Sequence, residues 1–151
     1  MFEISEINTI MQKVIDLFLI PKFKELKMEA TGEWERSLEI EAYEESGTIR
    51  GRYYSQQLAL GRRPGKMPPI KPIQDWAMAK FGVGAKEALG IAFAVAKKIK
   101  KEGTSWHQKG GSDLIEVLQE KRTIEFIESE LTAIATFKVA ENLRRNVIVN
   151  L

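Results

Sequence analysis

The fold is decided by the stretch Leu38-Glu39-Ile40-Glu41-Ala42-Tyr43-Glu44-Glu45-Ser46-Gly47-Thr48-Ile49-Arg50-Gly51-Arg52-Tyr53-Tyr54. On both sides of its Glu45-Ser46-Gly47 segment, mostly apolar residues alternate with charged residues or tyrosines. A period of two around a glycine-containing turn is typical of an antiparallel β-hairpin. The outward residues are acidic on the first arm and basic on the second. Opposite charges across paired strands contribute roughly 0.2–1 kcal/mol per pair and help to fix the register. The sequence therefore predicts a hairpin over about residues 38–54.

An amphipathic helix is predicted before the hairpin. Apolar residues recur there at spacings of three and four, at Ile4, Ile7, Met11, Val14 and Phe18. This spacing places them on one face of a helix. We expect Pro21 to kink or restart the helix, because proline lacks a backbone donor and clashes with the preceding turn.

Four further segments follow the hairpin. Gly61–Pro69 is rich in glycine and proline and predicts an exposed loop. Two central helices are expected, over Pro72–Phe81 and over Lys86–Lys101, and a long helix is expected from about Leu114 toward Leu143. The tail Val147–Leu151 is apolar and rich in β-branched residues, so we expect a C-terminal strand that adds to a sheet edge of its own chain or of a neighbour.

These elements predict one α+β domain over residues 1–151. A small antiparallel sheet, made of the hairpin and the C-terminal strand, is flanked by the N-terminal helix, the two central helices and the long C-terminal helix. The length fits one domain, and the hydrophobic fraction of 44% is enough for a core.

Composition argues against most catalytic chemistry. The 151 residues include no cysteine and one histidine, and the net charge is +2. The absence of cysteine excludes disulfides, thiolate catalysis and zinc–thiolate sites, and a single histidine excludes a His-pair metal site. His107 lies near Ser105, Ser112 and Asp113 in sequence, but a lone histidine in a glycine-flanked loop is more often a surface or interface residue. We expect no enzyme activity, no catalytic or metal-binding residues and no cofactor.

No targeting or membrane segment is expected. The N-terminus is acidic where a signal peptide is basic, and the apolar run Val14–Ile20 is far shorter than the roughly 20 residues of a membrane span. The sequence predicts a soluble protein made in a cytoplasm, with no membrane partner.

Residues 50–71 hold six cations and no acid, which leaves two interpretations open. They could bind nucleic acid, or they could form the basic half of a head-to-tail contact between copies, because the chain also carries acidic residues. Gly61–Lys66 lacks the spacing of a P-loop. Trp34 and Trp106 are interface anchors or core residues. The candidate interface residues are Arg50, Arg52, Arg62, Arg63, Lys66, Trp34, Trp106, Val147, Ile148 and Val149.

The order of motifs resembles the tail-completion or head–tail connector (neck) proteins of tailed phages. Three blocks carry the resemblance: Thr31–Leu38, Gly-Arg-x-Pro-Gly-Lys-x-Pro-Pro-Ile over Gly61–Ile70, and the alanine-rich Ile91–Ile99 followed by a Lys-x-Gly-Thr turn over Lys101–Thr104. The first of these begins with Thr-Gly and ends in Ser-Leu, and the second block is the most specific. The similarity covers roughly residues 30–120.

This resemblance implies a structural virion protein. It implies a homo-oligomeric ring of roughly six or twelve copies at the neck, with portal or connector subunits on one side and tail-tube or tail-terminator subunits on the other. Such a protein is located in the virion after synthesis in the host cytoplasm, and genomic DNA passing through the channel is a further expected neighbour. The alternative is a basic DNA-binding accessory protein of a phage or prophage.

Overall fold

The computed structural model describes residues 1–52 and 54–149, the side chains of residues 148 and 149 excepted, and it has an α+β fold. One long N-terminal helical segment runs through three pieces: α1 (Ile4–Val14), the π-helical turn η1 (Ile15–Leu19) and α2 (Ile20–Glu25). Glu3 and Glu6 close its start with a capping box. The wider π turn ends at Leu19 and α2 begins at Ile20, so Pro21 lies in the first turn of α2, where its missing donor is tolerated.

The predicted hairpin is present and shorter than expected. After the short helix α3 (Glu33–Arg36), β1 (Glu39–Ala42) pairs antiparallel with β2 (Gly47–Arg50). Ile40 faces Ile49 in the register, and the Arg50 guanidinium lies 2.8 Å from the Glu41 carboxylate on the opposite strand. Cross-strand pairing of opposite charges is confirmed there. The second strand ends at Arg50, so the predicted arm is wrong beyond that residue: Gly51 and Arg52 are not in the strand, and Tyr54 lies in the turn that starts α4. Tyr53 lies outside the described residues.

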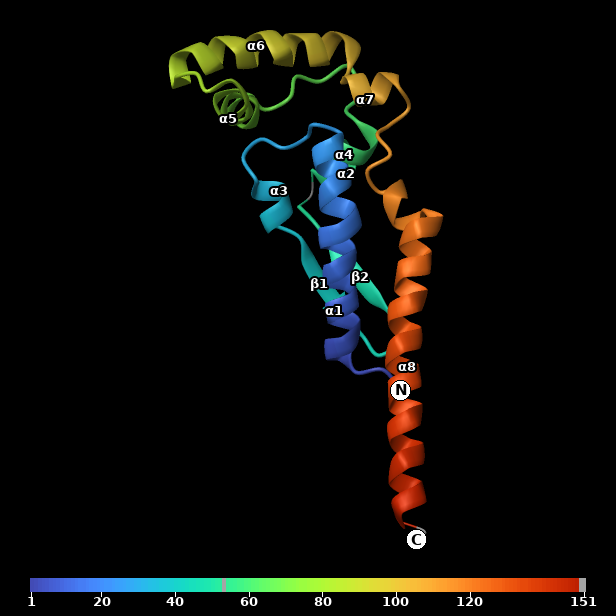
Figure 1. The fold of residues 1–151 in the computed structure, drawn as a ribbon. Helices are drawn as coiled ribbons and strands as arrows, with labels where there is room; N and C mark the ends of the chain where they lie inside the picture. Colours follow the sequence, from blue (N-terminus) through green and yellow to red (C-terminus); the bar gives the residue numbers. More distant parts are fainter. Residues whose placement is uncertain (53, 150–151) are drawn as a thin grey trace.

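Two helices form a separate layer at one end of the molecule. A short helix α4 (Ser55–Leu60), which the sequence reading did not predict, leads into the glycine- and proline-rich loop. Helices α5 (Ile70–Phe81) and α6 (Ala85–Glu102) confirm the two central helices, and they pack through Ala77, Ala88, Ala92 and Ala96, all fully buried. Figure 1 shows α6 lying across the end of the molecule opposite the C-terminus.

The chain returns to the body through a short helix α7 (Ser105–Gln108) and a 3₁₀ turn η2 (Glu116–Gln119) before α8 (Lys121–Val149). Helix α8 therefore begins seven residues later than Leu114, where the sequence predicted it. The core explains the difference, because Leu114 and Val117 are fully buried against Ile15, Leu19, Phe23 and Trp34 from an irregular turn rather than from a helix.

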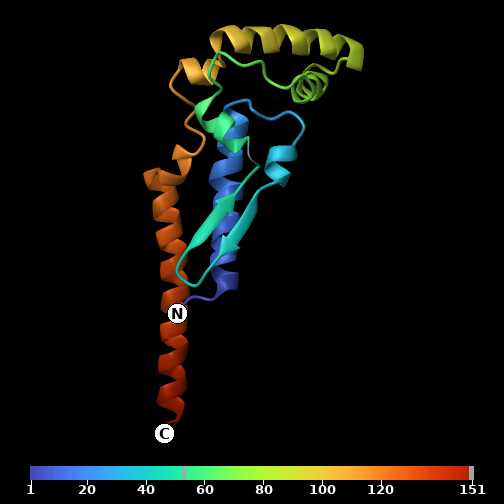
Figure 2. The same ribbon diagram turned by 180° about the vertical axis from the view of Figure 1, so that it is seen from behind.

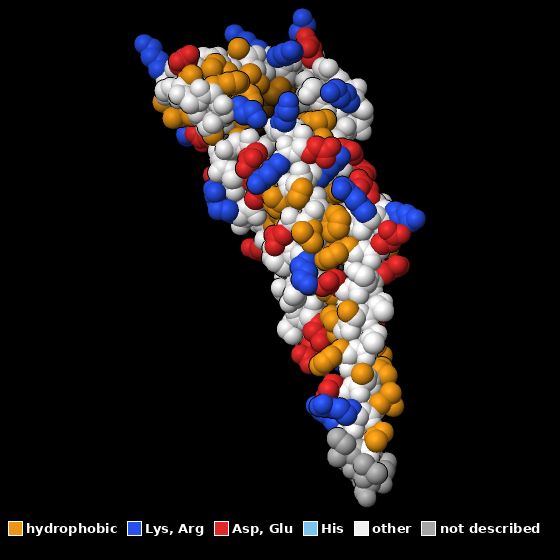
Figure 3. All heavy atoms as spheres, in the orientation of Figure 1, with side chains coloured by type: hydrophobic (Ala, Val, Ile, Leu, Met, Phe, Trp, Pro, Cys, Tyr) orange, Lys and Arg blue, Asp and Glu red, His pale blue; other side chains and the backbone are white. Residues whose placement is uncertain are grey.

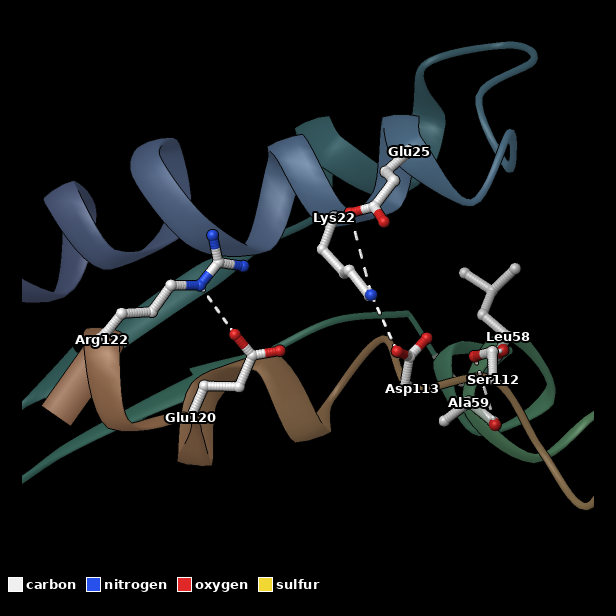
Figure 4. Close-up of polar contacts among 8 residues, drawn as sticks. All are labelled: Lys22, Glu25, Leu58, Ala59, Ser112, Asp113, Glu120 and Arg122. Carbon is white, nitrogen blue, oxygen red and sulfur yellow. Dashed lines mark hydrogen bonds and ion pairs between the residues drawn. The ribbon is translucent and has the colours of Figure 1, made fainter.

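Polar contacts fix this turn against α2 and α4. Ser112 donates from its amide to the carbonyl of Ala59 and from its hydroxyl to that of Leu58. The Lys22 ammonium lies 2.8 Å from the Asp113 carboxylate, as Figure 4 shows. The hydrogen bond between these two groups lowers the pKa of Asp113 and raises that of Lys22, in each case against the desolvation of the site.

The predicted C-terminal strand is wrong for residues 147–149, which are helical. The β-branched run Val147-Ile148-Val149 is only the last turn of a 29-residue helix, so the helix that precedes it overrides its local strand propensity. Asn150 and Leu151 lie outside the described residues. Figures 1 and 2 both show the C-terminal half of α8 extending beyond the N-terminal end of α1, away from the rest of the molecule.

Candidate functional site

Charge is divided unevenly between the two ends of the molecule. Residues 61–111 hold eleven lysines and arginines against three acids, a net charge of +8. The other 100 residues hold twelve against eighteen, a net charge of −6. The total of +2 thus hides a strongly basic end and an acidic body.

Eight cations of the basic end gather on the loop after α4 and on the segment from the end of α6 to just past α7. We call this set the basic head: Arg62, Arg63, Lys66, Lys97, Lys98, Lys100, Lys101 and Lys109. All are exposed except the half-buried Arg62, and within the part of the chain that the structure describes none of the eight forms an ion pair. Nine of the other fifteen lysines and arginines do form one. Figure 3 shows lysine and arginine side chains around this end.

The loop that carries the arginines is held rigidly against the segment after α6. The amide of Thr104 donates to the carbonyl of Arg62 at 3.0 Å, and the amide of Arg62 donates to the Thr104 hydroxyl at 2.8 Å. The amide of Gly65 donates to the carbonyl of Lys100 at 2.8 Å. Gly61 has a φ of +76°, and a Cβ there would lie 2.2 Å from the amide nitrogen of His107. Only glycine permits this approach.

A hollow of about 550 Å³ lies beside the two arginines. It is lined by Gln56 and Gln57 of α4, by Arg62 and Arg63, and by His107 of α7. Residues with guanidinium, amide and imidazole groups therefore line one open hollow. The sequence reading missed the two glutamines, because nothing in their local pattern distinguishes them from any polar pair on a short helix.

Arg50 and Arg52 do not belong to the basic head. Arg50 pairs with Glu41 across the hairpin, and Arg52 lies 3.8 Å from Glu33. Their positive charges are thus compensated locally by acids of the same chain. The predicted basic segment 50–71 separates into a paired hairpin part and an unpaired loop part.

The two tryptophan candidates have different environments. Trp34 is 4% exposed, its ring stacks on Phe23 at 4.6 Å, and its indole N–H donates to the Ser55 hydroxyl at 2.8 Å. Its candidacy as an interface anchor is wrong, because these contacts place it in the core. Trp106 is half-buried beneath the Lys109 ammonium, which lies 5.3 Å from the ring centroid, and it remains accessible at the basic head.

Helix α8 has apolar residues on two different faces. Near its start, Ile127, Leu131 and Ile134 are half-buried, and the ring centroid of Phe126 lies 5.4 Å from that of Phe18 in the N-terminal helical segment. Further along, Lys138 turns toward α1, where its ammonium lies 2.7 Å from the Glu6 carboxylate. The hydrogen bond from the Glu3 amide, followed by this bond to Lys138, lowers the pKa of Glu6. The contact fixes which side of α8 faces the body.

The distal half of α8 turns its apolar residues away from the body. At 3.6 residues per turn, Ala140, Leu143 and Val147 lie on the side opposite Lys138, and Phe137 and Val139 flank them. We call these five residues the outer face of α8. Phe137 is 67% exposed, Leu143 61% and Val147 62%. Figure 3 shows hydrophobic side chains along this outer edge of the helix.

The predicted interface residue Val147 thus belongs to this exposed helical face and not to a strand. The side chains of Ile148 and Val149, which were also predicted there, lie outside the described residues. The sequence held the signal for the outer face, in the spacing of Phe137, Ala140, Leu143 and Val147. This spacing differs in phase from that of Ile127, Leu131 and Ile134, which face the body.

Within residues 1–52 and 54–149, no three His, Cys, Asp or Glu side chains come close enough together to hold a metal ion. In the same part of the chain, no helix has the length and apolar character needed to cross a bilayer.

No known protein family, curated protein or solved structure matches this chain.

Proposed function

We propose that this chain is a structural subunit of a tailed-phage particle that assembles with copies of itself into a ring at the head–tail neck. The observation that carries the proposal is the outer face of α8, an apolar surface on a helix that extends beyond the body. The place of the ring in the virion is proposed only from the order of sequence motifs over residues 30–120, which resembles that of neck and tail-completion proteins.

The outer face of α8 needs a partner for physical reasons. The segment from Phe137 to Val147 is the distal part of the 29-residue helix α8, and this part of the helix extends beyond the body. Its contacts with the body are polar, through Lys138 to Glu6 and to the carbonyl of Met1. Three of its large apolar side chains are more than three-fifths exposed, and grouped apolar exposure of this kind marks interaction surfaces.

A second copy of the chain is the partner that the charge distribution favours. A ring is built from a heterologous contact, in which one surface of a subunit meets a different surface of the next. The opposite net charges of the basic end and the acidic body would orient one copy relative to the next at long range, without burying the basic head in the contact. The outer face of α8 would supply the apolar area that charge pairs alone do not. In the neck, the ring would meet portal or connector subunits on one side and tail-tube or tail-terminator subunits on the other.

The test is the copy number of the chain in purified virions, measured by quantitative mass spectrometry against the portal protein. We expect roughly six or twelve copies per particle. Hundreds of copies would indicate a tail-tube or capsid role, and absence from the particle would contradict the proposal.

A further inference from the structure

We propose that the basic head binds the phosphate backbone of duplex DNA without regard to base sequence. The proposal depends on the unpaired cations and their rigid support, and it stands whether or not the chain forms a ring. It also narrows the hypothesis that residues 50–71 bind nucleic acid. The charges of Arg50 and Arg52 are compensated by Glu41 and Glu33, so these two arginines are not part of the proposed DNA-binding surface.

The shape of α6 suits a close approach by a long polyanion. Lys97, Lys98 and Lys101 lie on the side of α6 opposite the buried Ala88, Ala92 and Ala96. Gly90 and Ala94 lie on the same outer side and add almost no bulk, and the space above Gly90 is open. The strip from Gly90 to Lys101 is about 16 Å long, a length over which B-DNA carries roughly nine phosphate charges.

The loop lies beside the last turn of α6, where the Gly65 amide bonds to the carbonyl of Lys100. Its hydrogen bonds to Lys100 and Thr104 hold it in one conformation, so Arg62, Arg63 and Lys66 are positioned before any ligand arrives. Pre-ordering reduces the entropy lost on binding. The hollow beside Arg62 and Arg63 adds the donor groups of Gln56, Gln57 and His107, and phosphate contacts in protein–DNA complexes come from these residue types.

The rest of the molecule directs the ligand to this end. Its net charge of −6 repels a polyanion, whereas the segment 61–111 attracts it with +8. An acidic protein surface could also meet a basic patch, but charge pairs between proteins favour matched, bidentate geometry. Six of the eight cations here are lysines, which act as flexible point charges and suit a uniform row of phosphates.

The experiment is a fluorescence-anisotropy titration of a labelled duplex of scrambled sequence with the full-length protein, repeated from about 50 mM to about 200 mM salt. We expect binding that is independent of sequence and weakens by about a thousandfold over that range, as for roughly six neutralised phosphates. The variant Lys97→Gln/Lys98→Gln/Lys101→Gln should make the slope of log affinity against log salt shallower by about two to three units, since each phosphate contributes about 0.9.

The matched control is Lys24→Gln/Lys27→Gln/Lys121→Gln, which removes the same charge from exposed positions outside the basic head. It should leave the slope within about one unit of the wild type. Circular dichroism and thermal melting check that both variants fold.

Three outcomes would overturn the proposal: no binding at about 50 mM salt, an equal loss in the two variants, or an unchanged DNA slope in the head variant together with altered sedimentation. The last outcome would assign the basic head to a contact between copies. Sedimentation without DNA reports ring formation separately, so the two proposals can fail independently.

Discussion

Replacing Phe137 and Leu143 together by alanine tests whether the outer face of α8 is an interface. Alanine has the highest helix propensity, so the double variant removes apolar surface and leaves the helix intact. Because both side chains are more than three-fifths exposed, the folded monomer uses little of their burial energy. We expect normal folding and impaired self-association.

The size of the effect follows from the exposed fractions. Full burial of a Leu or Phe side chain contributes about 1.5–3 kcal/mol. Roughly two-thirds of that, about 1–2 kcal/mol per residue, is still available to a partner, and the two residues together can supply about 3 kcal/mol to each contact. At 1.4 kcal/mol per tenfold change, the dissociation constant should rise roughly 100-fold. The cost to the monomer is the remaining third, about 1 kcal/mol or less per residue.

Analytical ultracentrifugation over a concentration series measures the association, and urea unfolding measures monomer stability. The matched control is Phe81→Ala/Leu17→Ala, which removes the same two residue types from positions that are 55% and 54% exposed on other elements. Self-association that is equally weak in both variants, or unchanged in the α8 variant, would refute the reasoning. So would a loss of monomer stability large enough to account for the effect.

Three further predictions concern folding stability. Trp34→Phe should cost about 2 kcal/mol of unfolding free energy in urea titrations, because it removes a buried hydrogen bond to Ser55 and opens a small cavity. Gly61→Ala should cost about 2 kcal/mol or more and lower the melting temperature, since its Cβ would meet the amide of His107 and its φ is left-handed. The Lys22–Asp113 pair should make stability pH-dependent at both extremes. Because the pKa of Asp113 is lowered in the folded state, its contribution to the free energy of unfolding is lost as the pH falls through its folded-state pKa. Because the pKa of Lys22 is raised, its contribution is lost as the pH rises through the folded-state pKa of Lys22. Asp113→Asn should therefore flatten the acid limb of a plot of melting temperature against pH.

Local patterns predicted the elements whose stability is local. The hairpin has both arms and its turn within the quoted stretch, so alternation was enough to find it and to anticipate the Arg50–Glu41 pair. Helices α5 and α6 are bounded by glycines and a proline close to their ends, and these residues act through backbone geometry alone. The basic loop was expected from its composition, although its rigidity depends on Thr104 and Lys100, about 40 residues away.

Packing between distant segments decided the features that were missed. The spacing of Leu114 and Val117 fits the buried stripe of a helix. In the structure both pack in the core, Val117 from the 3₁₀ turn η2 and Leu114 from the turn before it, and α8 begins only at Lys121. Trp34 lies between the predicted N-terminal helix and the predicted hairpin, where its local sequence does not decide whether it is exposed. Phe23 and Ser55 enclose it from other parts of the chain. Val147 belongs to a β-branched run that predicts a strand in isolation, and it continues a helix that is already formed.

The two proposed surfaces should be coupled only through assembly. The basic head and the outer face of α8 lie at opposite ends of the molecule, and mutational effects at sites with no shared partner add. A ring would nevertheless place several basic heads on one long duplex, and linked sites raise apparent affinity without any new contact. Loss of the outer face should therefore weaken binding to a long duplex while leaving binding to a duplex too short for two heads unchanged. Equal weakening on both lengths would mean that the α8 variant perturbs the basic head itself.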